Sequence, residues 1–111
     1  MQSVANELCN SVIEDVLNVV GSKWAFLVIG HLYYGPCRFN QMKKTIPAIS
    51  TQSLSSVLRQ LEENGVVTRR AFATVPVTVE YSLSDKGRDF VQVIDAMRQC
   101  GYKWRHQSGT E

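Results

Sequence analysis

Apolar residues recur at helical spacing over most of the chain, and turn-forming residues interrupt the pattern at a few places. The pattern predicts helices at about 6–20, 23–34, 38–45, 51–64 and 85–104, and β-strands at 67–73 and 77–83. Breaks are expected at Gly21-Ser22, Gly35-Pro36, Pro47 and Asn64-Gly65. Ser50 and Ser84 are expected helix caps, because a hydroxyl can accept a hydrogen bond from a free amide in the first turn. The predicted fold class is mainly α with a small β-hairpin, whose tip is 74–76.

The helix after Ser50 has two contrasting faces. Its apolar stripe, at i, i+3, i+4 and i+7, must face a core and consists of Leu54, Val57, Leu58 and Leu61. The opposite face, here called the polar face, carries Gln52, Ser56, Arg59 and Glu63, flanked by Thr51, Ser53 and Ser55. Short hydroxyl and amide side chains can enter a DNA major groove and hydrogen-bond base edges. The alternative interpretation is an ordinary solvated helix with a serine-rich start.

The helix at 6–20 carries Cys9, Ile13, Val16 and Val20 along one face, and the helix at 23–34 carries Trp24, Leu27, Val28 and Leu32. We expect Phe39, Met42 and Ile46 to be buried and Phe90, Val91, Ile94 and Met97 to face inward. The first and last helices carry more apolar residues than one small core needs. Tyr102 and Trp104 lie beyond the expected core. Aromatic residues near a chain end are typical of a subunit interface. Alternatively, the two rings cover the chain's own first helix.

The charge is distributed unevenly along the 111 residues, although the net charge is only +2. Residues 1–22 carry three acidic residues and no Lys or Arg, a net of −3, whereas residues 38–70 carry six basic and two acidic residues, a net of +4. A basic segment beside a neutral or acidic remainder is typical of a DNA-binding surface. We therefore expect Arg38, Lys43, Lys44, Arg69 and Arg70 to neutralise phosphates.

Length and composition indicate one domain over residues 1–106 with a loose tail at 107–111. No apolar run approaches 18 residues, and no basic segment followed by an apolar one opens the chain, so we expect neither a membrane span nor a secretory signal. Cys9, Cys37 and Cys100 cannot all pair within the chain and show no CxxC spacing. Free thiols in a reducing cytoplasm are expected, and a zinc site is not.

An enzyme is not expected from this sequence. Neither His31 nor His106 has a Ser or Cys at a spacing that suggests a catalytic unit, and no glycine-rich phosphate loop is present. Glu62-Glu63 is typical of a solvated helix surface rather than of acid–base chemistry. No cofactor is expected either.

The three helices at 23–34, 38–45 and 51–64, followed by a hairpin and a last helix, have the winged-helix order, in which the helix at 51–64 enters DNA and the hairpin forms a wing beside it. The chain resembles the HxlR-type winged helix-turn-helix transcriptional regulators over roughly residues 11–104. The segments that carry the resemblance are GSKW at 21–24, GPCRF at 35–39, IS at 49–50, LRQLE at 58–62, NGVV at 64–67, VEYSL at 79–83 and DKG at 85–87. They stand in the family's order and spacing, and this ordered set is more specific than any one segment.

The resemblance implies a homodimer that binds an inverted repeat in double-stranded promoter DNA, with the first and last helices forming the dimer interface. The residues expected at the DNA are Arg38, Lys43, Lys44, Ser50, Thr51, Gln52, Ser53, Ser55, Ser56, Arg59, Arg69, Arg70 and Thr78. Two positions depart from the family pattern. Ser22 replaces a usual glycine, and Thr78 stands where Arg or Lys is common. The wing contact is therefore expected to be weaker, or to come from Arg69 or Arg70.

The resemblance also raises the question of redox or electrophile sensing, because several relatives sense through a cysteine near the N-terminus. Cys9 lies one or two residues early for that position and shares the apolar helix face, so a packing role and a sensing role both stay open. Cys37 follows Gly-Pro and precedes Arg38, which predicts an exposed thiol with a positive neighbour. Cys100 is expected to pack. The rival functions are a winged-helix module for protein contacts alone and a thiol-redox protein.

Overall fold

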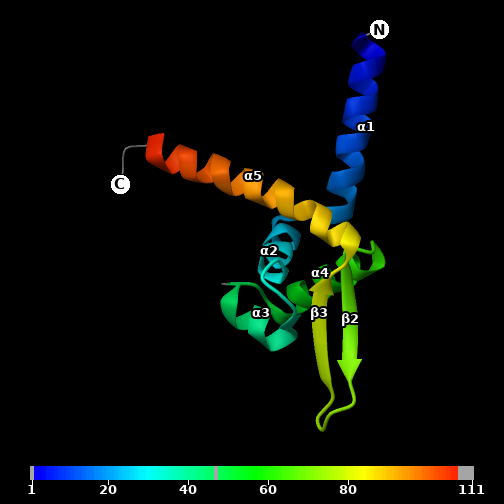
Figure 1. Cartoon of the computed structure of the whole chain (residues 1–111), viewed down its shortest axis with the longest axis vertical. Coiled ribbons are helices and arrows are strands. Elements are labelled where there is room, and N and C mark those ends of the chain that lie inside the picture. Colours follow the sequence, from blue (N-terminus) through cyan, green and yellow to red (C-terminus); the bar gives the residue numbers. More distant parts are fainter. Residues whose placement is uncertain (1, 47, 108–111) are drawn as a thin grey trace.

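The computed structural model describes residues 2–46 and 48–107, with side chains from residue 6 onward (Figure 1). In chain order the elements are α1 (Gln2–Val20), α2 (Lys23–Leu32), β1 (Cys37–Arg38), α3 (Phe39–Thr45), α4 (Thr51–Glu63), β2 (Val67–Phe72), β3 (Thr78–Leu83) and α5 (Asp85–Gln107). The expected helices and the hairpin are confirmed. Helix α5 includes Gln107, which we expected in a loose tail; the rest of that tail lies outside the described residues.

Serine hydroxyls cap the N-termini of three helices. Ser22 accepts a hydrogen bond from the Ala25 amide at 3.3 Å, so this departure from the family's glycine gives α2 a side-chain cap. The expected Ser50 cap is confirmed, because its Oγ accepts from the Ser53 amide at 3.0 Å. The Ser84 cap is confirmed by a 3.0 Å bond from the Gly87 amide. These caps set where α2, α4 and α5 begin.

The sheet has three antiparallel strands in the order β1-β3-β2. Strand β1 was not predicted, because two residues are too few to show an alternating pattern; the sequence instead suggested a helix starting at Arg38. Glu80 of β3 pairs with Arg38 of β1 on one side and with Arg70 of β2 on the other. Strands β2 and β3 continue past the core as the hairpin.

The core lies between α2, α3, α4, the base of the hairpin and the start of α5. The predicted α4 stripe is buried, with Leu54 and Leu61 fully so, and Met42 and Ile46 of the α3 region are buried as expected. Gly87 lets α5 approach the backbone carbonyl of Val66, where any β-carbon would collide. This contact fixes the base of α5 against the link between α4 and β2. No helix in the described part of the chain is long and apolar enough to cross a membrane.

Helices α1 and α5 project from this core in different directions, and the hairpin projects away from α1 (Figure 1). The radius of gyration is 16.7 Å, larger than the roughly 13 Å typical of a compact domain of this length. Val20 reaches the core, but Ile13 and Val16 on the same face are exposed. Only the last turn of α1 contacts the core, so most of the predicted apolar face of this helix is uncovered in the single chain.

Two apolar residues of α2 and α5 are also exposed in the chain. Leu27 is 46% exposed, and Met97, which we expected to face inward, is 51% exposed. Phe90 and Ile94 are buried as predicted, and Val28 and Leu32 are buried as well. Tyr102 and Trp104 are 60% and 69% exposed near the far end of α5. Since α1 and α5 diverge, these rings do not cover the chain's own first helix.

Candidate nucleic-acid interface

Helix α4 presents its polar face to solvent, opposite its buried apolar stripe. Gln52, Ser56, Arg59 and Glu63 are all exposed, as their position opposite the stripe predicted. Thr51 is exposed in the first turn, whereas Ser53 and Ser55 are half-buried at the edges of the face. The Ser50 hydroxyl accepts the Ser53 amide and keeps its own hydrogen free to donate. The first turns of α4 therefore offer amide and hydroxyl groups without a competing acidic residue.

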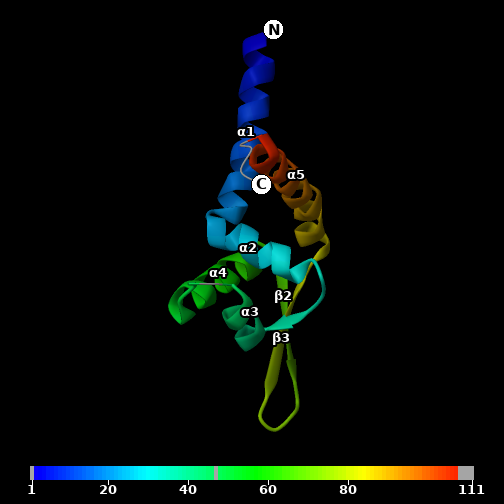
Figure 2. The ribbon, with the colours of Figure 1, turned by 90° about the vertical axis from the view of Figure 1, so that its left-hand side faces the viewer.

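Helix α3 supplies the basic residues nearest α4 in sequence. Lys43 and Lys44 lie in its last turn, where their charges also interact favourably with the helix dipole. Arg38 caps the other end, with its backbone amide donating to the Gln41 side chain at 2.8 Å. The Arg38 side chain is exposed. In Figures 1 and 2, α3 and α4 lie on the hairpin side of the molecule, away from the N-terminal end of α1.

The strand register places Arg38, Glu80 and Arg70 in one row across the sheet, because directly paired residues in antiparallel strands share a face. The Arg70 guanidinium carbon lies 4.8 Å from the centroid of the Phe72 ring, two residues along the same strand. Both arginines are exposed. The sequence did not reveal Glu80 as the shared neighbour of these two arginines, because β1 is too short to be predicted as a strand. Arg69 lies on the other face, opposite Tyr81.

The tip of the hairpin carries no charge. The loop between β2 and β3 spans 73–77, including the predicted tip at 74–76, and its two valines, Val75 and Val77, are exposed. The Thr78 hydroxyl lies 2.8 Å from the Thr74 hydroxyl, which in turn donates to the Pro76 carbonyl at 2.7 Å. Thr78 therefore contributes to the turn itself, and positive charge on the wing comes only from the strand arginines.

Two of the three cysteines, Cys37 and Cys100, lie in environments that differ from those we expected. Cys37 is half-buried against the core, not exposed. Burial raises the pKa of its thiol, and the nearby Glu80 carboxylate raises that pKa further, so the predicted positive neighbour does not dominate. Cys9 is exposed on α1, which is inconsistent with packing inside this chain. Cys100 is exposed as well, so its expected packing role within the chain is wrong.

A capped helix pair, α3 and α4, beside a three-stranded sheet with a projecting hairpin defines a winged helix-turn-helix protein. The HxlR-like helix-turn-helix family model matches residues 19–109. The chain belongs to this family of transcriptional regulators.

Relatives and solved structures agree with this membership. The HTH-type transcriptional regulator sll1512 of Synechocystis is 36% identical over 99 residues, covering 89% of this chain and 73% of that protein. The redox regulator HypR in its reduced form superposes with a TM-score of 0.81 at 33% identity, covering 89% of this chain and 98% of HypR. Reduced YodB from Bacillus subtilis gives a TM-score of 0.69 at 36% identity, covering 78% of this chain and 84% of YodB.

Proposed function

We propose that the chain is a sequence-specific DNA-binding regulator that acts as a homodimer on an inverted-repeat promoter site in the cytoplasm. The observation that carries this proposal is the exposed polar face of α4, which stands over a buried stripe beside basic residues of α3 and the sheet. Gln52 and the serines are suited to base edges or flanking phosphates. Lys43, Lys44 and Arg70 are suited to phosphates.

The exposed apolar residues of the two projecting helices support the dimer. Leu8, Val12, Ile13 and Leu17 are each more than half exposed on α1. Contiguous exposed apolar surface of this kind marks an interaction site. A dimer formed through α1 and α5 would present two copies of α4 to one duplex, with half-sites separated by one helical turn, about 34–36 Å.

The test is fluorescence anisotropy with labelled duplexes from the regulator's own upstream region and with a scrambled duplex of equal length. We expect binding to the upstream duplex to be at least about a thousandfold tighter than to the scrambled one. Equal affinity for the two duplexes would refute sequence-specific recognition. No binding to either would favour the alternative, a winged-helix module that contacts only proteins.

We also propose that an oxidant or electrophile regulates the chain through Cys9. The support is the exposure of Cys9 on α1 and the similarity to the redox regulator HypR and to the transcriptional regulator YodB, which has structures in a reduced and in a diamide-treated form. Modified or cross-linked thiols on α1 would change the separation of the two α4 helices. Mild oxidant should then release DNA from the wild type, reductant should restore binding, and Cys9→Ser should bind DNA regardless of oxidant. Oxidant sensitivity that persists in Cys9→Ser and disappears in Cys37→Ser would assign the sensor to Cys37.

A further inference from the structure

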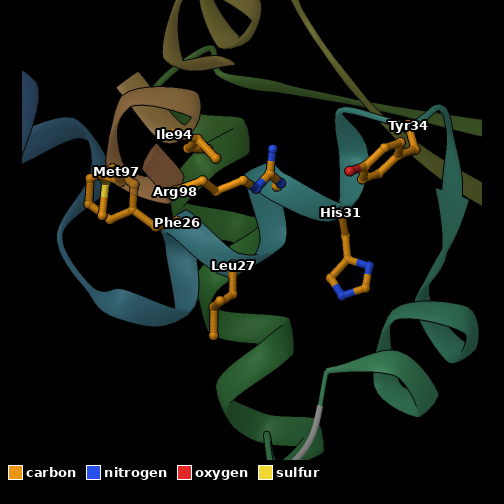
Figure 3. Close-up of a pocket in the computed structure, with 8 residues that line it drawn as sticks. Phe26, Leu27, His31, Tyr34, Ile94, Met97 and Arg98 are labelled. Carbon is orange, nitrogen blue, oxygen red and sulfur yellow. The ribbon is translucent and has the colours of Figure 1, made fainter. Parts of the chain in front are cut away.

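A groove of about 370 Å³ lies between α2 and α5 (Figure 3). Its apolar walls come from Phe26 and Leu27 of α2 and from Ile94 and Met97 of α5. This volume is at the small end of the range for ligand pockets, about 300–1,000 Å³. A dry cavity of about 150 Å³ with similar apolar walls can hold benzene. The groove is therefore large enough for one substituted ring.

Polar side chains meet this apolar surface at one place. Figure 3 shows the Arg98 guanidinium reaching from α5 across the groove to α2, with the Tyr34 hydroxyl directed toward it. The His31 ring extends from α2 toward α3, where its Nδ1 lies 3.5 Å from the Thr45 hydroxyl. Arg98 is thus the charged group that a molecule in the groove would meet.

The Arg98 guanidinium is held in position rather than freely solvated. Its Nη1 donates to Asp95 Oδ1 at 3.1 Å, and its central carbon lies 6.0 Å from the Tyr33 ring centroid. The Arg98 side chain is 34% exposed and the Asp95 side chain 48% exposed. An ion pair this exposed adds little to stability. A guanidinium has five N–H donors and Asp95 engages one, so donors remain for a second carboxylate.

Gly30 lines the groove beside Arg98. It is buried in α2, where glycine destabilises a helix relative to alanine. A β-carbon at this position would lie 3.4 Å from Arg98 Nη2 and would touch no other described side chain within 4 Å. Alanine would therefore fit sterically. The glycine instead leaves open the space next to the guanidinium.

We propose that this groove binds a small aromatic carboxylate. The ring would lie against Phe26, Leu27 and Met97, and the carboxylate would accept hydrogen bonds from Arg98, whose planar donors match it. Because α2 packs against both α4 and α5, a ligand between α2 and α5 would change how α4 sits relative to the projecting helix. This regulatory consequence rests on the proposed DNA-binding function, but binding of the ligand itself does not.

Methionine methyl NMR tests the site with benzoate as the probe and benzamide as its neutral isostere. Met97 lines the groove, whereas Met42 is fully buried in the core and provides an internal control. At constant ionic strength we expect benzoate to shift the Met97 methyl signal saturably and to leave Met42 unchanged. Benzamide should bind at least about tenfold more weakly, because it lacks the charge-assisted hydrogen bonds.

Three variants separate recognition from folding. Arg98→Gln should reduce benzoate affinity at least about tenfold, to the level of benzamide. Asp95→Asn removes only the partner of Arg98 and should bind benzoate at least as tightly as the wild type. Gly30→Ala should stabilise α2, and it should weaken benzoate binding several-fold because the added methyl group would occupy the space next to Arg98. An unchanged Met42 signal will verify that each variant retains the native core.

The proposal is overturned if benzoate and benzamide bind equally or if Arg98→Gln keeps wild-type affinity. It is also overturned if the Met97 methyl signal shifts with protein concentration but not with benzoate, because a second copy of the chain would then cover the groove. If the wild-type chain does not bind DNA but benzoate still shifts the Met97 methyl signal, only the proposed function is refuted. DNA binding without any Met97 response would refute only the groove proposal.

Discussion

Gln52 is the residue that we propose to distinguish one base from another. It is exposed in the first turn of α4, and its amide can pair with adenine in a bidentate manner. We predict that Gln52→Ala weakens binding to the specific site by about 1–3 kcal/mol and has a much smaller effect on scrambled DNA. Gln60→Ala is the matched control, because Gln60 is exposed on the same helix but lies beside Gly21. Equal losses on both duplexes would remove a base-reading role from Gln52.

Cys37 shows how one contact changes the chemistry of a residue. Burial raises the pKa of its thiol, with Glu80 as the second cause, so less thiolate is present at a given pH than for an ordinary cysteine. Glu80→Gln removes the second cause and should lower this pKa. We predict faster alkylation of Cys37 at pH 8 in Glu80→Gln, with Cys100 unchanged, measured by mass spectrometry. An unaltered rate for Cys37 would mean that burial alone controls its reactivity.

At the scale of elements, the apolar face of α1 extends well beyond the one turn of this helix that contacts the core. A charge in the middle of that face should prevent pairing, because an unpaired charge in an apolar interface is costly. We predict that Ile13→Glu weakens dimerisation at least about a hundredfold in analytical ultracentrifugation. Ser11→Glu adds the same charge on the polar side of α1 and should leave the dimer intact. Two variants with equal effects would place the interface elsewhere.

The helices were predictable from sequence because their apolar spacing is strong and their caps are serines. Ser50 and Leu54 illustrate this, since both occupy the positions that the pattern predicted. Strand β1 was not predictable, because Cys37 and Arg38 become a strand only by pairing with Tyr81 and Glu80, more than 40 residues away. Periodicity also places Met97 on an apolar face without showing that this face extends beyond the chain's own core.

At the scale of the whole molecule, α3 and the sheet carry five of the twelve Lys and Arg residues and α5 carries another five, whereas α1 has none. Each phosphate contact contributes about one to the slope of log affinity against log salt concentration. We predict that Lys44→Gln lowers this slope by about one. Lys103→Gln makes the same change on α5 and should leave the slope as it is. An unchanged slope in Lys44→Gln would mean that Lys44 does not contact a phosphate.

The candidate site as a whole could be predicted only in part. The composition of the α4 polar face and the clustering of charge were visible in the sequence. The row formed by Arg38, Glu80 and Arg70 was not, because it depends on strand register. The groove at Arg98 was also not visible, because it requires α2 and α5, which are far apart in sequence, to lie against one another.

Selection of binding sites from random-sequence duplexes tests the central claim most directly, because it requires no knowledge of the natural target. The account predicts one enriched inverted repeat with half-site centres about 10–10.5 base pairs apart, or a multiple of that spacing, bound by two chains. The enrichment should depend on Gln52. Recovery of no common sequence, or of a single half-site bound by one chain, would contradict recognition by a dimer through α4.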